Sequence, residues 1–324
     1  MKRRLSAFLG LTLATTALSQ GGALAQTFPN RPITFVVPFS VATTSDVLAR
    51  AISRHMSERM GVGVIVDNRP GASGSIGNSL VAKAAPDGHT LLATATSFVI
   101  SKSLNPSLPY DPANQFTPLV LLATDVMGLL VNNDLPAKSI GEVIALAKAK
   151  PGTLFYASPG NGTPQHMSME FFKMETGTNI VHVPYKEQSG ALADLVAGRA
   201  NLMINSVPNL QRQIDAGKLR LVAMLSADRV PTAPSIPTLK EAGYPNLQTS
   251  LWYGVLGPAG LPNDISNRLN REINGALENT ELRSLYEKTG LTQGGGPPER
   301  FTEWLRAELQ RWPRVVAKTG IKPD

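Results

Sequence analysis

The chain has 324 residues, of which 42% are hydrophobic and 17% charged, and its formal net charge is +7. It contains no cysteine, which excludes disulfide bonds and thiolate chemistry, and its scattered lysines and arginines, with no aromatic residues interleaved, give nucleic-acid binding little support. A chain of this length can form one large domain or two of medium size.

The N-terminus has the three parts of a cleavable secretory signal. Met1–Arg4 is basic, Leu5–Leu18 is apolar or small, and Ala23–Ala25 has the small-x-small spacing of a signal-peptidase site. We expect residues 1–25 to be removed and the mature protein to begin at Gln26 in the periplasm. The alternative is an uncleaved membrane anchor, which needs about 20 apolar residues. This stretch is shorter, and it is diluted by Thr15, Thr16, Ser19 and Gln20.

After this segment, short apolar runs alternate with segments of helical periodicity. This alternation indicates an α/β fold whose sheets are mainly parallel. The first unit consists of the strand Ile33–Phe39, the polar loop Ser40–Ser45 and a helix that opens at Asp46, which we expect to be its N-cap.

The same unit recurs in the middle of the chain. The strand Leu154–Ala157 is followed by the loop Ser158–Pro164 and then by a helix through Met167, Phe171 and Met174. Loops of this kind place hydroxyls and unpaired backbone N–H groups at a helix N-terminus, where the helix macrodipole favours negative charge. Two such loops facing each other would clamp a small carboxylate.

Two crossings divide the predicted elements between two domains. The apolar runs Leu119–Ala123 and Met127–Val131 mark the first crossing, and the chain returns around Ser250–Gly257. We expect residues 26–125 and 254–324 to form domain 1 and residues 126–253 to form domain 2. The other predicted strands are Val64–Val66, Thr90–Thr94, Ile180–Val183, Ala200–Ile204 and Leu219–Leu225. The other predicted helices include Ile140–Ala149, Ser189–Ala197, Val207–Ala216, Asn263–Leu277, Glu281–Thr289 and Pro298–Val316.

Further hydroxyl side chains, Thr96 and Ser97, come after the end of the strand Thr90–Thr94. In open α/β sheets the carboxyl ends of strands present groups to ligands, although hydroxyls there also cap the next helix.

Motifs of catalysis are missing from the sequence. Gly71, Gly74 and Gly77 are spaced G-x-x-G-x-x-G, which differs from the dinucleotide pattern. Without a G-x-S-x-G elbow, and with four histidines in no recognisable arrangement, an exported hydrolase is the weaker alternative. No H-E-x-x-H motif or His/carboxylate cluster predicts a metal site. We therefore expect a binding protein without catalytic residues, cofactor or metal.

Several segments, in order, resemble the Bug family of periplasmic solute-binding proteins, the TctC-type receptors of tripartite tricarboxylate transporters. The similarity extends from Phe28 to the C-terminal helices. The segments are Pro32–Phe39, Val66–Gly71, Ala85–Gly88, Tyr110–Pro112, His182–Lys186 and Pro237–Pro245.

This resemblance implies a two-domain periplasmic binding protein fold, type II-like, with each domain a mainly parallel sheet flanked by helices. It implies a monomeric receptor that binds a small organic acid in the interdomain cleft and delivers it to the permease subunits of a tripartite tricarboxylate transporter. The alternative is a sensor that signals to a membrane kinase, because transport and sensing would use the same closed, liganded form. In this family the loops that correspond to Ser40–Asp46 and Ser158–His166 hold the carboxylate.

The sequence departs from the family at the first of these loops. Val41-Ala42-Thr43 stands where Ala-Gly-Gly is common, which reduces backbone freedom and adds a hydroxyl beside the expected carboxylate. His166 could donate to the ligand or act as a local cap, and Asn205 would repel an anion less than an aspartate. The residues that we expect to bind the ligand are Thr43, Thr44, Ser45, Asp46, Thr96, Ser97, Ser158, Asn161, Thr163, His166 and Asn205.

Overall fold

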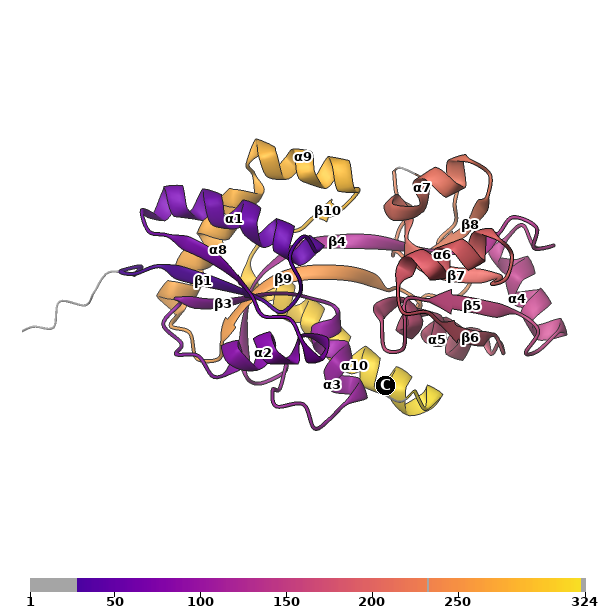
Figure 1. Cartoon of the computed structure of the whole chain (residues 1–324), viewed down its shortest axis with the longest axis horizontal. Helices are drawn as coiled ribbons and strands as arrows, with labels where there is room; N and C mark the ends of the chain where they lie inside the picture. Colours follow the sequence, from indigo (N-terminus) through magenta and orange to yellow (C-terminus); the bar gives the residue numbers. More distant parts are fainter. Residues whose placement is uncertain (1–27, 232, 322–324) are drawn as a thin grey trace, which may run out of the picture.

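A computed structural model describes residues 28–231 and 233–321 of the chain. The predicted signal segment, residues 1–25, lies outside the described residues. The described chain forms an elongated molecule of two lobes (Figure 1). The lobes are connected by the long strand β4 (Phe116–Asn132) and by β9 (Ser250–Pro258), which pairs with it.

The first lobe contains one end of the sheet, formed by strands from before the first crossing and by one short strand after the return. Its strands are β1 (Ile33–Val37), β2 (Val64–Asn68), β3 (Thr90–Ala95) and the short β10 (Thr292–Gln293). β1 pairs in parallel with β2 and β3, whereas β3 pairs antiparallel with β9.

The second lobe contains the other end of the same sheet. Its strands are β5 (Phe155–Ser158), β6 (Val181–Pro184), β7 (Leu202–Ser206) and β8 (Leu219–Met224). β5 pairs in parallel with β6 and β7, while β7 and β8 pair antiparallel with β4. The expected α/β fold is therefore present, with parallel pairs among the outer strands of each lobe, and the sheet as a whole is mixed. A chain that crosses to a second lobe and returns beside itself must run in opposite directions, which makes the central strands antiparallel.

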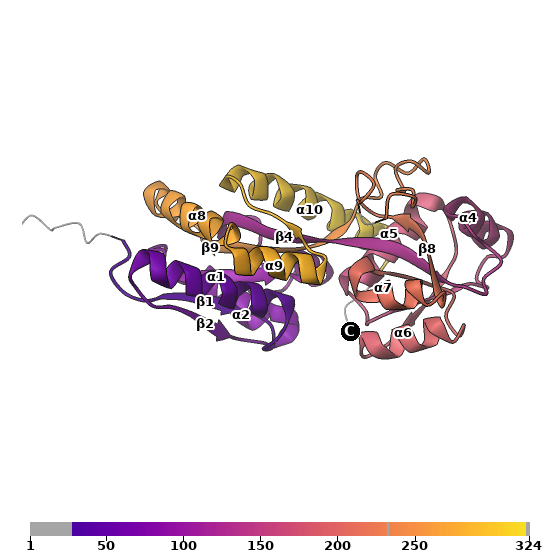
Figure 2. The same ribbon diagram turned by 90° about the horizontal axis from the view of Figure 1, so that it is seen from above.

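Helices cover both faces of the sheet in each lobe, as Figure 2 shows. The first lobe has α1 (Thr44–Met60), the 3₁₀ turn η1 (Ala72–Gly74), α2 (Ser75–Ala82), α3 (Ser97–Leu104), α8 (Asn263–Leu277), α9 (Thr280–Thr289) and α10 (Pro298–Thr319). The second lobe has α4 (Ile140–Ala149), α5 (Pro164–Thr176), α6 (Gln188–Val196) and α7 (Val207–Asp215). No helix among the described residues is long and apolar enough to cross a membrane.

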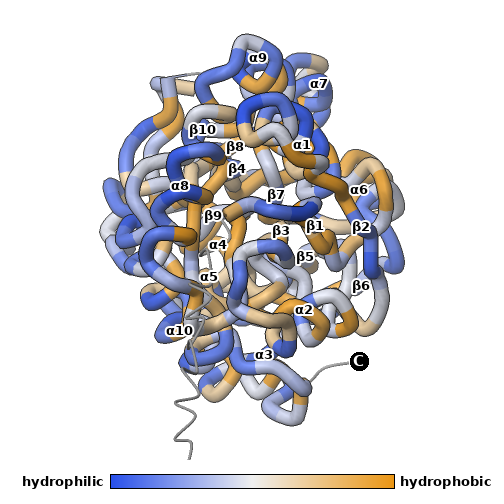
Figure 3. The backbone as a smooth tube through the Cα atoms, turned by 90° about the vertical axis from the view of Figure 1, so that its left-hand side faces the viewer, coloured by the Kyte–Doolittle hydropathy of each residue, from blue (hydrophilic) through white to orange (hydrophobic). Residues whose placement is uncertain are grey.

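The hydrophobic core runs along the strands, and the hydrophilic segments lie on the outer helices (Figure 3). The C-terminal helix α10 packs on α3 and β4 and reaches α5 of the second lobe. Its Glu308 is buried and accepts hydrogen bonds from the indole N–H groups of Trp252, at 3.2 Å, and Trp312, at 2.8 Å. Burial raises the pKa of Glu308. This polar contact ties α10 to β9 at the connection between the lobes.

Most predicted elements occur where the sequence places them, and the main differences concern β4, the start of α1 and α3. The apolar runs Leu119–Ala123 and Met127–Val131 are parts of the single strand β4. Asp46 is the third residue of α1, whose N-cap is Thr43. The helix α3 was not expected as an element, because eight residues after a strand end give little periodicity to detect.

Candidate functional site

The loop after β1 is folded tightly against the start of α1. Ala42 has φ 66, in the left-handed region that favours glycine, and Thr43 is the N-cap of α1 with φ −71 and ψ 159. The Thr43 hydroxyl donates to the carbonyl oxygen of Ser40 at 2.9 Å. The hydroxyls of Thr43, Thr44 and Ser45 therefore lie at the positive end of the α1 dipole.

Asp46 holds this loop from inside the helix. Its side chain is 1% exposed and accepts hydrogen bonds from the backbone N–H of Ala42, at 2.9 Å, and from Nδ2 of Asn68, also at 2.9 Å. The guanidinium of Arg50 donates to both carboxylate oxygens. Burial acts to raise the pKa of Asp46, but the hydrogen bonds from Arg50, Ala42 and Asn68 outweigh it and hold the pKa below its ordinary value. The expected N-cap role is wrong, and the carboxylate supports the loop from behind.

The loop after β5 is held in a similar way by buried side chains. The Ser158 side chain is fully buried, with its hydroxyl 2.7 Å from Nε2 of His182 and 3.1 Å from the carbonyl oxygen of Gly160. Thr163 is the N-cap of α5, and its hydroxyl accepts from the His166 N–H at 3.3 Å and donates to Gly160 at 2.8 Å.

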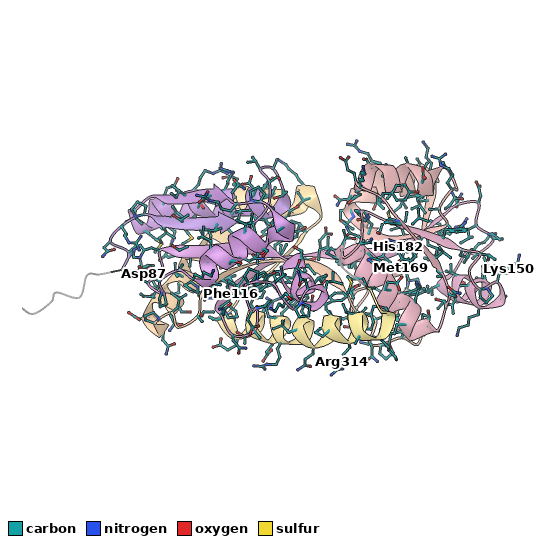
Figure 4. All side chains as sticks on the ribbon, turned by 60° about the horizontal axis from the view of Figure 1, so that its bottom comes forward. Asp87, Phe116, Lys150, Met169, His182 and Arg314 are labelled. Atoms are coloured by element: carbon teal, nitrogen blue, oxygen red, sulfur yellow. The ribbon has the colours of Figure 1, made fainter. Side chains whose placement is uncertain are left out.

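Two histidine rings lie under this second loop. Nδ1 of His166 accepts a hydrogen bond from the backbone N–H of Gly162 at 3.0 Å. The His166 and His182 rings stack with centroids 4.0 Å apart and 9° between their planes, and His182 stacks in turn on Tyr156 at 4.6 Å. Figure 4 labels His182 in the second lobe. His182 is not among the residues expected at the site, and its contact with Ser158 joins the neighbouring strands β6 and β5.

The two loops face each other across a cavity of about 620 Å³, here called the larger cavity. Its wall in the first lobe includes Ser40, Thr43 and Gly71 from loops, Gly74 of η1, and Ser97 and Ser101 from α3. Its wall in the second lobe is made by Asn161, Gly162, Thr163 and Pro164.

A smaller cavity of about 260 Å³ shares Phe39, Thr43, Ser97 and Pro164 with the larger one. Its other lining residues include Thr44, Ser45 and Thr96, and also Leu251 and Tyr253 of β9. None of the residues that line either cavity is charged. An anion in these cavities would be held by neutral donors, namely hydroxyls, amides and the backbone N–H groups at the start of a helix.

The structure brings seven of the eleven expected ligand-binding residues to these two cavities. They are Thr43, Thr44, Ser45, Thr96, Ser97, Asn161 and Thr163. The Thr96 hydroxyl also accepts a hydrogen bond from the Trp252 N–H at 2.8 Å, so it fixes β9 beside the smaller cavity.

The other four expected residues, Asp46, Ser158, His166 and Asn205, do not line these cavities. Asn205 is fully buried on β7, where its Oδ1 accepts from the Ser206 N–H at 2.8 Å. All four are buried, and direct contact with a ligand stays a prediction for them. The sequence could not show this, because burial of a polar residue near a strand end depends on what packs over it.

Sequence reasoning missed residues on the crossing strands. Leu251 and Tyr253 line the smaller cavity, although their segment was considered only as a connection between domains. The available signal was the spacing of Leu251 and Tyr253, which are two positions apart and therefore lie on the same face of the strand. Asp125 of β4 was also missed; it is 5% exposed and accepts a hydrogen bond from the Ser206 hydroxyl at 2.8 Å.

A third cavity, of about 470 Å³, lies in the second lobe and shares Asn161 and Thr163 with the larger one. Lys186 is the single charged residue that lines it. Within residues 28–231 and 233–321, no group of three or more His, Asp or Glu side chains is arranged to hold a metal ion.

Comparisons with known proteins give the context of this geometry. The sequence matches the model of the tripartite tricarboxylate transporter family receptor over residues 48–321. It is 36% identical over 321 residues to the protein BugT of Bordetella pertussis, covering 98% of each chain. An R. palustris protein solved with adipate has a TM-score of 0.73 and 35% identity, over 92% of this chain and 100% of that one. MatC from Rhodopseudomonas palustris, solved with bound malate, has a TM-score of 0.72 and 30% identity, over 89% of this chain and 100% of that one.

Proposed function

The chain belongs to the tripartite tricarboxylate transporter receptor family, and we propose that it captures a small organic acid between its two lobes. The family and its solved neighbours are solute-binding receptors, so the chain is a receptor and not an enzyme. Adipate and malate, the molecules named with two of the neighbours, are both carboxylates, which supports the same ligand class here.

The observation that carries this proposal is the composition of the two connected cavities. Hydroxyl and amide side chains from both lobes line them, no lining residue is charged, and the N-terminus of α1 opens onto them. Neutral donors at a helix N-terminus can bind a carboxylate without a positively charged side chain. Because the donors come from both lobes, a ligand that uses all of them must bridge the lobes.

Each group has a distinct role in this proposal. The hydroxyls of Thr44 and Ser45, with the backbone N–H groups of the first turn of α1, hold one carboxylate. The Thr43 hydroxyl, which donates to the Ser40 carbonyl in this conformation, turns to the ligand when it binds. Asn161 and Thr163 reach the other end of the ligand from the second lobe. Asp46, Ser158 and His166 keep the two loops in place, through the hydrogen bonds that they make to Ala42, Gly160 and Gly162.

The conformational change belongs to the same proposal. Domain 1, residues 26–125 and 254–324, and domain 2, residues 126–253, would close about the crossing strands β4 and β9. Ligand would shift the population toward the closed form, in which donors of both lobes contact it. We infer that a monomer in this closed form is recognised by the permease subunits of a tripartite tricarboxylate transporter, after export and cleavage at Ala25.

A binding screen tests the proposed function. The protein is produced with its own N-terminus and purified from the periplasm, and mass spectrometry then gives the N-terminal residue, expected to be Gln26. Thermal unfolding is measured with mono-, di- and tricarboxylates, acidic amino acids and aromatic acids, and calorimetry follows each shift. A ligand at 100 times its dissociation constant stabilises the native state by about 2.7 kcal/mol, which raises the melting temperature by a few degrees. Sugars and amines serve as controls, and a shift with these but with no acid would overturn the proposal.

A further inference from the structure

Asp125 lies where β4 exchanges one partner strand for another. β4 pairs with β9 as far as Val126, and it pairs with β7 from Met127 onward. The Asp125 side chain is 5% exposed, and its hydrogen-bond donor is the Ser206 hydroxyl of β7, at 2.8 Å. The buried carboxyl therefore joins the crossing strand to the second lobe.

The same carboxyl lies behind the wall of the smaller cavity. Asp125 is paired with Leu251 across the antiparallel β4–β9 ladder, and directly paired residues project from the same face of a sheet. Tyr253, two positions after Leu251, projects from that face as well. Leu251 and Tyr253 both line the smaller cavity. Burial, together with the negative charge of Asp125, raises the pKa of Tyr253 to about 12.

Among residues 28–231 and 233–321, no cation is paired with Asp125. The group that faces it from β7 is Ser206 and the one from β9 is Tyr253, and both are neutral. No charged side chain elsewhere in the described chain forms an ion pair or hydrogen bond with it. Arg50, near the cavity loop, is paired with Asp46, and Lys186 lines the separate third cavity.

The ligand carboxylate would bring a second negative charge to this neighbourhood. Thr43, Thr44 and Ser45 line the same small cavity as Leu251 and Tyr253, so an anion held by them lies close to the wall that covers Asp125. A second negative charge near a buried carboxylate that has no cation beside it raises the pKa of that carboxylate and favours uptake of a proton. Burial raises the pKa of Asp125 to about 6, so a modest further rise on ligand binding would change its protonation in the range between pH 6 and pH 7.

We propose that ligand capture is coupled to protonation of Asp125, so that the receptor takes up an organic acid anion together with a proton. This inference rests on the proposed function and specifies how the same site balances charge. The proton comes from the solvent and binds to a carboxylate oxygen of Asp125, and the ligand stays ionised at the start of α1. The Ser206 hydroxyl then donates to a neutral carboxyl.

Calorimetry in two buffers of different ionisation enthalpy measures the protons taken up, with adipate as the probe and malate as a second one. If binding raises the pKa of Asp125 by about one unit, about half a proton per ligand is taken up at pH 6.5, and affinity falls about sevenfold between pH 5.5 and pH 8. The Asp125→Asn variant should bind without this uptake and with a nearly flat pH profile.

Two further variants make the test specific. Asp134→Asn removes the same charge from an exposed position just beyond β4 and should retain the uptake of the native protein. Ser206→Ala removes the hydrogen bond that stabilises the ionised carboxylate of Asp125. The dependence of ligand affinity on pH should therefore persist in this variant but move to higher pH. A merely structural role of Asp125 would change affinity equally at all pH values.

The outcomes separate the two proposals. Binding of adipate or malate with equal proton uptake in the native protein and in Asp125→Asn, or with none in either, overturns the coupling and leaves the carboxylate receptor standing. If the native protein binds neither these probes nor any acid of the panel, the proposed function fails and the coupling fails with it.

Discussion

The carboxylate of Asp46 accepts a hydrogen bond from the backbone N–H of Ala42 at 2.9 Å, four residues back along the chain. The contact closes the first cavity loop onto the helix that follows it. It places Ala42 in the left-handed region and directs the hydroxyl-bearing residues after it toward the cavities. The conformation of this loop therefore depends on the side chain of Asp46, which lines neither cavity.

Replacing Asp46 with Asn should destabilise the protein. The variant keeps one acceptor oxygen but loses the charge that pairs with Arg50 and the second acceptor, a loss of about 1–3 kcal/mol for charge-assisted hydrogen bonds. Urea unfolding at pH 7 measures the difference. Asp264→Asn, an exposed change in the first turn of α8, should cost less than about 0.5 kcal/mol.

The Asp46 contribution should also depend on pH with a defined sign. The folded-state pKa lies below the ordinary value of 3.8, so the stabilisation is present in full above pH 3.8 and is lost as the pH falls through the folded-state pKa. The difference between the native protein and Asp46→Asn should therefore diminish in acid. A difference that stays constant down to pH 2 would contradict the assignment.

Replacing Ala42 with Gly should leave stability unchanged or raise it by up to about 1 kcal/mol. An L-residue in the left-handed region costs roughly 1–2 kcal/mol, which glycine avoids, and glycine's greater freedom in the unfolded chain offsets part of the gain. Ala307→Gly, an exposed change inside α10, should instead cost about 1 kcal/mol. Thermal unfolding of both variants makes the comparison, and equal losses would argue against strain at Ala42.

Thr43→Val should weaken ligand binding about tenfold and lower stability only slightly. Valine keeps the shape of threonine and removes the hydroxyl, and a hydrogen bond to an anion is worth about 1.5 kcal/mol or more. Thr153→Val is the matched control, because the Thr153 hydroxyl makes the same kind of bond, to the carbonyl of Lys150 at 2.8 Å, away from both cavities. Calorimetry with the acid of the panel that binds most tightly measures the affinities. Equal affinity in the native protein and both variants would show that the Thr43 hydroxyl does not bind the ligand.

Asp125 should make the protein less stable as the pH rises. Its folded-state pKa of about 6 exceeds the ordinary value of 3.8, so no penalty exists below pH 3.8 and the full penalty is present above pH 6. Because one pKa unit corresponds to 1.36 kcal/mol, the unfolding free energy of Asp125→Asn relative to the native protein should rise by about 2.5 kcal/mol between pH 4 and pH 8. Chemical unfolding without ligand at both pH values measures this. If the difference in unfolding free energy between the two proteins is the same at both, the pKa of Asp125 is not raised in the folded state.

The order of elements could be predicted from local patterns. The helices Ile140–Ala149 and Asn263–Leu277 have the predicted bounds, and most strands agree within a few residues. The family expected from the motifs is confirmed by the match over residues 48–321. These features depend on side-chain periodicity, capping residues and turns, which are properties of neighbours in the chain.

Pairing across the sheet could not be predicted in the same way. Nothing local shows that Leu119–Ala123 and Met127–Val131 are one strand, or that β9 returns antiparallel beside it. The resulting sheet is mixed because the chain crosses between lobes and comes back, a property of the whole path.

The sequence by itself determined the chemistry of the two loops, hydroxyl-rich segments ahead of helices, because a residue's type and its place at a helix start are local properties. The tertiary structure decided which of those side chains reach the cavities. Thr43 and Asn161 do, whereas Asp46 and Ser158 are held behind the loops by Arg50 and His182, partners that no spacing reveals. Burial is set by what packs against a group from distant parts of the chain, and so is the charge balance around Asp125.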